Sequence, residues 1–364
     1  MKRRSGFTLI ELMVVLVIMV VIALGVAFNL GGFNTKQNLE LALNSLTAVV
    51  RDTQQRSVTQ QDGGTWGLHF YNTDSDRYEV FKGINYDAGT LDKFYVFRHG
   101  IGFSNPSTSS TIDVIFNALN GKSVNNQIIS LVTSKGEGLV GDVIIGQSGL
   151  VTNRIEKDLV DYWHFDEGTS TIAYDASGKN SNGTLTLGPT WQSESGCKAG
   201  KCLNFNGTNY VNVPNVESLK PAEEITVLAW IKPSLQGTRE FLATKWNGFT
   251  VELNTLNQVT AGANIAGSQR MTPVSSALSN NTWTHIAFTY SSRSRTLTTY
   301  INGNQEIKSS VLSGLATYSM AVSNNDLRIG SYSTYYWNGL IDEVRIYNRA
   351  LSPEEILDIY NDLK

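Results

Sequence analysis

Residues 6–12, GFTLIEL, begin a nearly unbroken apolar run that continues to Phe28. At about 1.5 Å rise per residue, a helix over residues 7–28 would be about 33 Å long, which is enough to cross a bilayer core of about 30 Å. The residues before it include Lys2, Arg3 and Arg4, whose positive charges would hold the N-terminal side in the cytoplasm. The pattern predicts a membrane-spanning helix segment over residues 7–30.

Two features separate this segment from ordinary targeting sequences. A secretory signal has a shorter apolar core, and its small-residue cleavage site follows that core, whereas here Gly6 precedes the whole run. A plain membrane anchor would leave Glu11 unexplained, because an unpaired carboxylate inside an apolar segment costs several kcal/mol.

The leader and the start of the run resemble the processing site of type IV prepilins and type II secretion pseudopilins. The resemblance implies that residues 1–6 are a leader, that a prepilin peptidase cleaves after Gly6, and that the new amino group of Phe7 is methylated. It also implies that Glu11 pairs with the Phe7 amine in the growing fibre, where each charge offsets the desolvation of the other. The implied partners are other pilin or pseudopilin subunits and an inner-membrane assembly platform. The protein would be single-pass in the membrane before assembly and then lie on the pilus or cell surface.

The chain after the apolar run changes period twice. Apolar residues recur every three or four positions from about Thr35 to Gln61, which predicts an amphipathic helix. Strand-like segments begin at Thr65. Residues 1–153 resemble H-type minor pseudopilins and FimT-type minor pilins, which implies a globular domain over residues 31–153 with the helix on a small antiparallel sheet. Residues 154–158 are then a short linker without a flexible spacer, so we expect this domain to be closely coupled to the one that begins at residue 159.

Residues 159–364 have the pattern of an all-β domain. In residues 225–231, ITVLAWI, both faces of the strand are apolar, as expected inside a sandwich. Residues 160–168, VDYWHFDEG, and 338–352, NGLIDEVRIYNRALS, resemble laminin-G-like or concanavalin A-like jelly rolls. The predicted fold is therefore an α+β pilin domain followed by an all-β jelly-roll sandwich.

The composition and the cysteines narrow the class of protein. A net charge of −3 without a long basic run disfavours nucleic acid as a partner. Cys197 and Cys202 are too few for a structural zinc site. Export from the reducing cytosol favours a local disulfide between them, although two reduced thiols remain the alternative.

No catalytic constellation is apparent, so we expect a protein that is not an enzyme. Glycosidases on a sandwich need two carboxylates around the scissile bond, and two on one strand face would be spaced i,i+2 or i,i+4. From Asp161 onward no acidic pair is spaced i,i+2, and the i,i+4 pairs lie in a short C-terminal helix, which the capping box of residues 352–355, SPEE, predicts. Distant residues could still converge in the fold.

No cofactor is required by this interpretation, but a structural calcium ion is one expectation. Related jelly rolls often hold one near the sheet edge, and the residues that match acidic or amide positions of the family motifs are Asp166, Asp175, Asn180 and Asp342. Turn capping by Asp and Asn side chains is the alternative.

The residues from Gly330 to Gly339 are rich in aromatic side chains and form a loop. Exposed rings supply binding area at low entropic cost, so Tyr332, Tyr335, Tyr336 and Trp337 are the candidate ligand-binding residues. The alternative is that these rings pack onto the edge of the sandwich.

The sequence as a whole predicts a minor pilin or pseudopilin that carries a laminin-G-like module for an extracellular glycan or surface ligand. A secretion pseudopilin with a protein-binding module and a fibre-tethered glycoside hydrolase are the alternatives.

Overall fold

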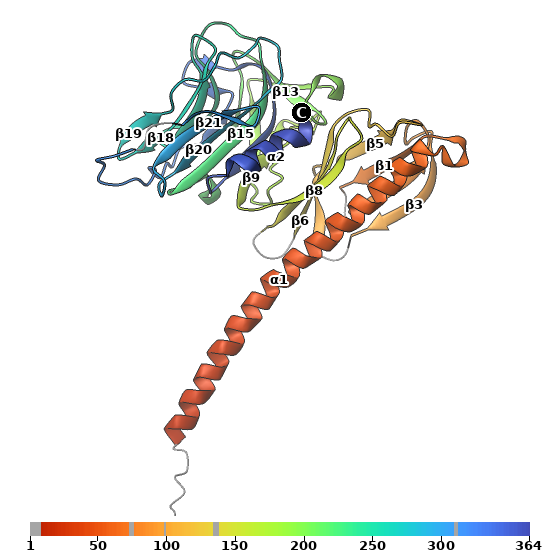
Figure 1. The fold of residues 1–364 in the computed structure, drawn as a ribbon, viewed down its shortest axis with the longest axis horizontal. Helices are drawn as coiled ribbons and strands as arrows, with labels where there is room; N and C mark the ends of the chain where they lie inside the picture. The colour runs from red at the N-terminus through yellow and green to blue at the C-terminus, as the bar shows by residue number, and fades with distance from the viewer. Residues whose placement is uncertain (1–8, 73–75, 98–99, 134–137, 309–311) are drawn as a thin grey trace, which may run out of the picture.

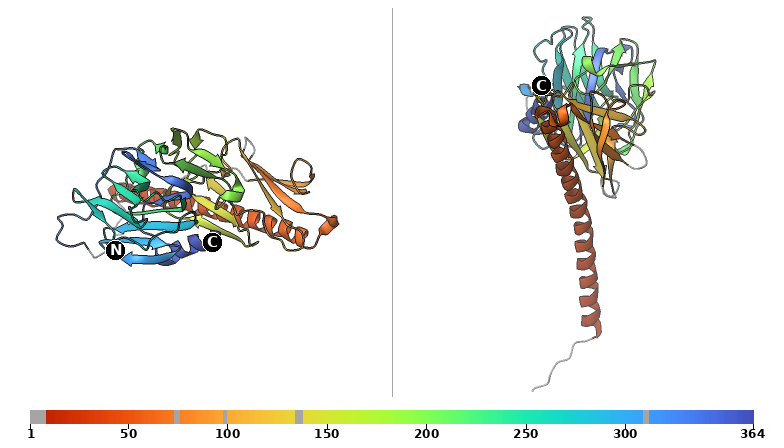
Figure 2. Two further views of the ribbon diagram at one scale, coloured as in Figure 1. Left: turned by 90° about the horizontal axis from the view of Figure 1, so that it is seen from above. Right: turned by 90° about the vertical axis from the view of Figure 1, so that its right-hand side faces the viewer.

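The computed structural model describes residues 9–72, 76–97, 100–133, 138–308 and 312–364. Side chains are described for all of these except 9–12, 17–18, 20–34 and 307–308. A long helix, α1 (Leu9–Val58), extends from a β-rich body, and its C-terminal part packs against that body (Figures 1 and 2).

The first half of the body contains two antiparallel four-stranded sheets. One has the order β3-β2-β1-β5, from β3 (Thr90–Val96), β2 (Arg77–Lys82), β1 (Trp66–Tyr71) and β5 (Thr111–Phe116). The other has the order β4-β6-β7-β8, from β4 (Ile101–Asn105), β6 (Gln127–Thr133), β7 (Val140–Ile145) and β8 (Val151–Glu156). A 3-10 turn, η1 (Gln61–Gly63), joins α1 to β1. The prediction named one small sheet; the structure has two, and the buried stripe of α1 contacts both.

The predicted apolar stripe of α1 is confirmed. Leu39, Leu43, Leu46 and Val50 are each at most 2% exposed and share one core with both sheets. Gly141 on β7 allows the closest approach, because a Cβ there would meet Leu43 at 2.4 Å.

Most side chains of the predicted membrane segment, residues 7–30, are outside the set that the structure describes. Gly6 and Phe7 lie outside the described residues, and so does the side chain of Glu11. Among the residues that were described, no helix is long and apolar enough to span a membrane.

The second half is the predicted jelly-roll sandwich of two antiparallel sheets. The β16 sheet is β10 (Ile172–Ala173), β11 (Gly183–Thr186), β14 (Tyr210–Val213), β23 (Leu327–Ile329), β16 (Glu240–Lys245), β17 (Phe249–Leu253), β18 (Val259–Ile265) and β19 (Ser268–Met271), in spatial order. The β15 sheet is β12 (Thr190–Gln192), β13 (Cys202–Asn206), β26 (Asn338–Tyr347), β15 (Glu224–Pro233), β20 (Thr284–Ser291), β21 (Thr296–Ile301) and β22 (Asn304–Lys308), with β9 (Leu159–Trp163) paired to β26.

The sheet β4-β6-β7-β8 is a middle layer between α1 and the sandwich. Because side chains alternate along a strand, Val143 and Ile145 of β7 join the core beneath α1. Val140 and Ile144 point the other way and pack with residues of the sandwich. Residues 154–156 of the expected linker are the end of β8, and only Lys157 and Asp158 separate β8 from β9. The domain boundaries at 153 and 159 stay predictions.

The C-terminal helix α2 (Pro353–Leu363) closes the same boundary (Figure 1). It begins with the predicted capping box, in which Ser352 Oγ accepts from the Glu355 N–H and the Ser352 N–H donates to the Glu355 carboxylate. Its apolar face covers the outer face of the β15 sheet, and Leu363 clusters with Trp230, Ile128 and Ile144 from both halves.

A buried ionic network spans this boundary. Arg345 on β26 donates to Glu156 Oε1 of β8 at 3.1 Å and to Glu343 Oε2 at 3.0 Å, and its guanidinium lies 4.2 Å above the Tyr162 ring. Arg345 also donates to the Tyr162 hydroxyl, which donates in turn to Glu343. The Arg345 side chain is 2% exposed, so its charge is compensated by protein groups rather than by water.

A second chain of hydrogen bonds crosses the boundary through His164. Its Nδ1 lies 2.8 Å from Glu343 Oε1 and its Nε2 lies 2.9 Å from Ser130 Oγ. Ser130 donates to Asp142 Oδ1 at 2.6 Å. Burial and the nearby Glu156 raise the pKa of Asp142 to about 6, against the opposing field of Arg345. Burial alone would also raise the pKa of Glu156, but Arg154 and Arg345 lower it to about 2.

Replacing Arg345 tests how much this network contributes to the unfolding free energy. An Arg345→Met variant should lose about 3–5 kcal/mol of unfolding free energy, because Glu156 and Glu343 are left buried without their cation. The matched control is Arg349→Met, whose side chain is 25% exposed and pairs with Glu355 and Asp158; its loss should be smaller, because water reaches the two carboxylates that are left behind. Urea denaturation of the full chain in detergent measures both. Equal losses in the two variants would contradict the role of Arg345.

The raised pKa of Asp142 predicts a pH dependence with a definite sign. The folded chain binds this proton more tightly than the unfolded chain, so stability is gained as the pH falls from about 6 towards the ordinary value of 3.8. In an Asp142→Asn variant that gain is absent. The wild-type unfolding free energy, relative to the variant, should therefore rise by up to about 3 kcal/mol between pH 8 and pH 4. Parallel pH profiles of the two proteins would refute the assignment.

Candidate functional site

The outward face of the β16 sheet carries a polar row across its middle. The strand register defines two adjacent rows of residues, each running across the strands of this sheet. The inner row is buried in the sandwich core and consists of Val211, Ile329, Ala243, Val251 and Ala261. The row one residue along faces away from that core and consists of Asn212, Arg328, Thr244, Thr250 and Gly262.

An exposed tryptophan rises beside this row. Trp246 stands in the turn between β16 and β17 and is 53% exposed. Its ring stacks on Tyr332, with centroids 5.3 Å apart and an angle of 19° between the planes. Tyr332 packs in turn on Phe241, at 4.9 Å. The stacking on Tyr332 thus holds the exposed ring of Trp246 in a fixed orientation.

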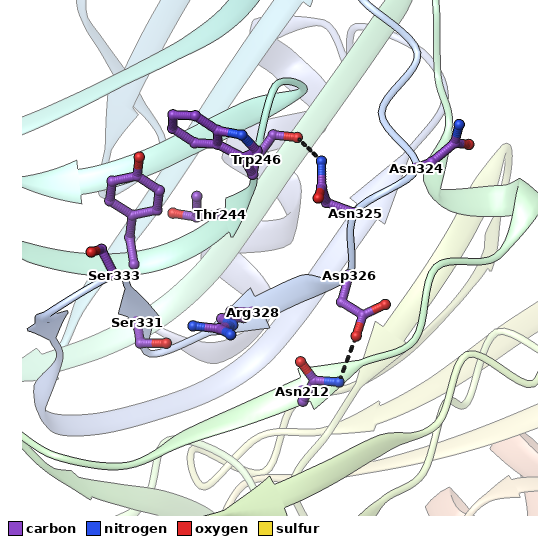
Figure 3. A pocket seen from close by; sticks show the side chains of 10 residues that line it. Asn212, Thr244, Trp246, Asn324, Asn325, Asp326, Arg328, Ser331 and Ser333 are labelled. Carbon is purple, nitrogen blue, oxygen red and sulfur yellow. Dashed lines mark hydrogen bonds between the residues drawn. The ribbon is translucent and has the colours of Figure 1, made fainter.

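A groove of about 460 Å³ opens next to the aromatic pair (Figure 3). Its lining residues are Asn212, Thr244, Trp246, Asn324, Asn325, Asp326, Arg328, Ser331, Tyr332 and Ser333. A second cavity of about 430 Å³ shares Thr244, Trp246 and Tyr332 with the first. The Trp246–Tyr332 pair therefore forms a wall common to two hollows.

Hydrogen bonds hold the polar side of the groove in place. Asp326 accepts from the Asn212 side-chain amide and from the Asn215 N–H, both at 3.0 Å. The Asn325 amide donates to the Trp246 carbonyl at 3.2 Å, as drawn in Figure 3. Lys245, beneath the groove, donates to Asn215 Oδ1 at 2.7 Å, and burial lowers its pKa to about 8.

The four aromatic residues predicted to bind a ligand differ in their exposure. Tyr332 and Tyr336 are half-buried and Tyr335 is 41% exposed, and the short hairpin of β24 (Ser331–Tyr332) and β25 (Tyr335–Tyr336) holds all three. Tyr335 lies against Phe241, with ring centroids 5.9 Å apart. Tyr336 lies 6.5 Å from Tyr210. These three remain candidates at the groove or its rim.

The prediction for Trp337 was wrong. Its side chain is 0% exposed and belongs to the sandwich core. The backbone N–H of Trp337 donates to the Gly330 carbonyl and closes the hairpin. The Trp337 ring then enters the core just before β26 begins. The sequence analysis missed Trp246 instead, although a tryptophan directly before Asn247 and Gly248 in a turn was a usable signal.

The four residues predicted for calcium occupy different settings. Asp175 accepts from the N–H groups of Tyr162, Ser177 and Ser181. Asn180 is exposed in a left-handed conformation with φ of 63°. In the part of the chain that the structure describes, no three His, Cys, Asp or Glu side chains gather as metal ligands.

The other two calcium candidates, the half-buried Asp166 and the buried Asp342, also accept hydrogen bonds from amides. Asp166 accepts from Asn105 Nδ2 at 2.8 Å and from the Lys201 N–H at 2.6 Å. Asp342 accepts from the N–H groups of Lys198 and Ala199. Burial, with the nearby Glu343 and Asp166, raises the pKa of Asp342. Calcium binding stays a prediction.

The predicted disulfide between Cys197 and Cys202 is confirmed. It ties the 3-10 turn η2 (Glu194–Gly196) to the first residue of β13. The bond lies beside β13 of the β15 sheet, whereas the groove lies on the β16 sheet.

Comparison with known proteins assigns both ends of the chain. The family profile of the concanavalin A-like lectin/glucanases superfamily matches residues 205–357. The profile of the prokaryotic N-terminal methylation motif matches residues 1–27. Human adhesion G-protein coupled receptor D1 is 40% identical over 77 residues, which are 20% of this chain and 8% of the receptor.

Solved structures resemble the chain more distantly. Domain 4 of AbnA, an extracellular GH43 arabinanase from Geobacillus stearothermophilus solved with arabinotriose, is 21% identical with a TM-score of 0.45, over 56% of this chain and 98% of that one. The binding domain of Paraclostridial Mosquitocidal Protein 1 has the same identity and TM-score, over 56% and 52% of the two chains. The chain thus joins a pilin-like N-terminus, with its methylation motif, to a laminin-G-like domain of the concanavalin A-like superfamily.

Proposed function

We propose that this chain is a minor subunit of a type IV pilus or related fibre and that its laminin-G-like domain binds carbohydrate outside the cell. The observation that carries the proposal is the aromatic-walled polar groove on the β16 sheet. The methylation motif at residues 1–27 supports assembly into a fibre with other pilin-type subunits, after processing by a prepilin peptidase.

The chemistry of the groove suits a sugar. The apolar face of a sugar ring can lie on the exposed ring of Trp246, which stacks on the half-buried Tyr332. Its hydroxyl groups need partners that donate and accept, and the amides of Asn212, Asn324 and Asn325 do both. A volume of about 460 Å³ lies within the usual range for ligand pockets.

The orientation of the sandwich supports display of the groove. The outer face of the β15 sheet is covered by α2 and the sheet β4-β6-β7-β8. The groove is on the opposite sheet, so packing of α1 into a fibre leaves it accessible.

The proposed role is binding without catalysis. Among the described residues that line the groove, Asp326 is the one carboxylate, and two donors already hold it. Glycoside hydrolysis commonly needs a pair of carboxylates around the bond.

Truncation of the aromatic pair tests the binding site. Trp246→Ala and Tyr332→Ala should each weaken binding to a glycan found on an array by about 1–3 kcal/mol, because the stacking surface is lost. Phe94→Ala is the control, since this ring is 59% exposed but lies on β3 in the other half. Calorimetry on the full chain in detergent measures the affinities. A loss in the control, or none in either groove variant, would move the site elsewhere.

Replacement of Glu11 tests the fibre role. Glu11→Ala should leave membrane insertion and cleavage intact, because the segment becomes more apolar, but it should remove the protein from sheared fibres. Glu40→Ala is the control, because Glu40 lies on the same helix and forms an exposed pair with Lys36. Immunoblots of the membrane and fibre fractions measure both. Normal incorporation of Glu11→Ala into fibres would refute the pairing role.

A further inference from the structure

We propose that the groove selects an acidic sugar and that Arg328 binds the carboxylate of a uronic- or sialic-acid-type residue. This inference rests on the proposed carbohydrate-binding function and names its ligand class. It follows from the position of Arg328, from an unpartnered hydroxyl beside it, and from the charges around the groove.

Arg328 lies at the centre of the groove. On the strand register it stands between Asn212 of β14 and Thr244 of β16. Its guanidinium is 4.8 Å from the centre of the Tyr210 ring, which fixes its direction. Among the described residues, no carboxylate lies within 4.0 Å of Arg328 to form an ion pair. Arg239, near the second cavity, differs because it already pairs with Glu252 at 2.7 Å.

The hydroxyl of Ser331 provides an independent indication of a ligand. The side chain is 0% exposed, and its Oγ has no hydrogen-bond partner among the residues described. It lines the same groove, and Figure 3 shows Ser331 and Arg328 pointing toward one another. A buried hydroxyl without a partner is costly, so a ligand atom at this place would remove that cost.

These two groups define the ligand's chemistry. A guanidinium only donates, and a serine hydroxyl is free to donate, so the ligand must present oxygen acceptors close together. A carboxylate has two such oxygens and suits the planar geometry of arginine.

The charges around the groove favour a single negative charge. Arg328 and Lys245 are positive, and Asp326 is negative. Both oxygens of Asp326 are held by Asn212 and the Asn215 N–H, which leaves Arg328 for the ligand. One carboxylate balances this set, whereas a doubly charged phosphate would add repulsion from Asp326.

The experiment compares an oligogalacturonate and a sialylated trisaccharide with their carboxyl-reduced forms and with a sulfated glucan. Binding to the full chain in detergent is measured by calorimetry at low and at high salt. The acidic sugars should bind at least tenfold more tightly than their reduced forms, and salt should narrow the difference.

Arg328→Gln should lose roughly 10–100-fold in affinity for the acidic sugar and little for the reduced form. The control is Arg295→Gln, because Arg295 makes the same kind of stack on Tyr318, at 4.3 Å, but lies in the turn between β20 and β21. Ser331→Ala is a second test variant that should fold normally, because the hydroxyl that it removes has no partner. It should nevertheless weaken the binding of the acidic sugar.

The outcomes separate this inference from the proposed function. Equal affinity for acidic and reduced sugars, or binding of the sulfated glucan alone, overturns the carboxylate assignment and leaves carbohydrate binding in place. Unchanged affinity of Arg328→Gln for the acidic sugar overturns it as well. Absence of binding to every one of these probes and to every glycan on an array overturns the proposed function itself.

Discussion

Arg345 carries a positive charge into the boundary between the sheet β4-β6-β7-β8 and the sandwich, where it is 2% exposed. Such a charge is tolerated only if carboxylates and hydrogen bonds surround it. Glu156 comes from the first half and Glu343 from the second, so both halves must be in place before the charge is satisfied. This requirement places Glu156 of β8 next to Arg345 of β26. The apolar packing of α2 and Trp230 then fills the space around it.

The position of the groove is a consequence of that boundary. A sandwich has two outer faces, and here the β15 sheet faces the first half and α2. The β16 sheet therefore remains for a ligand, with the polar row of Arg328 and Thr244 beside the exposed ring of Trp246. The proposed fibre assembly through α1 and the proposed binding at the groove therefore use separate surfaces of the chain.

Local patterns in the sequence were sufficient for the elements themselves. The three- and four-residue spacing of Leu39, Leu43 and Leu46 predicted the buried face of α1, because helical geometry alone places these residues on one side. The capping box at Ser352 and the doubly apolar strand of residues 225–231 were also confirmed, because each is defined by residues next to one another in the chain. The close spacing of Cys197 and Cys202 likewise predicted their disulfide.

The sequence by itself thus determined the pilin-like N-terminus, the order of helix and sandwich, and the disulfide, since each depends on residues close together in the chain. Only the tertiary structure decided which aromatic rings are exposed. Trp337 enters the core as the hairpin closes, whereas Trp246 is held outside by its turn and meets Tyr332 from a distant strand. The ionic network could not be predicted from the sequence either, because Arg345 and Glu156 are 189 positions apart in the chain. No local sequence pattern predicts this contact, because it depends on how two folded sheets pack against each other.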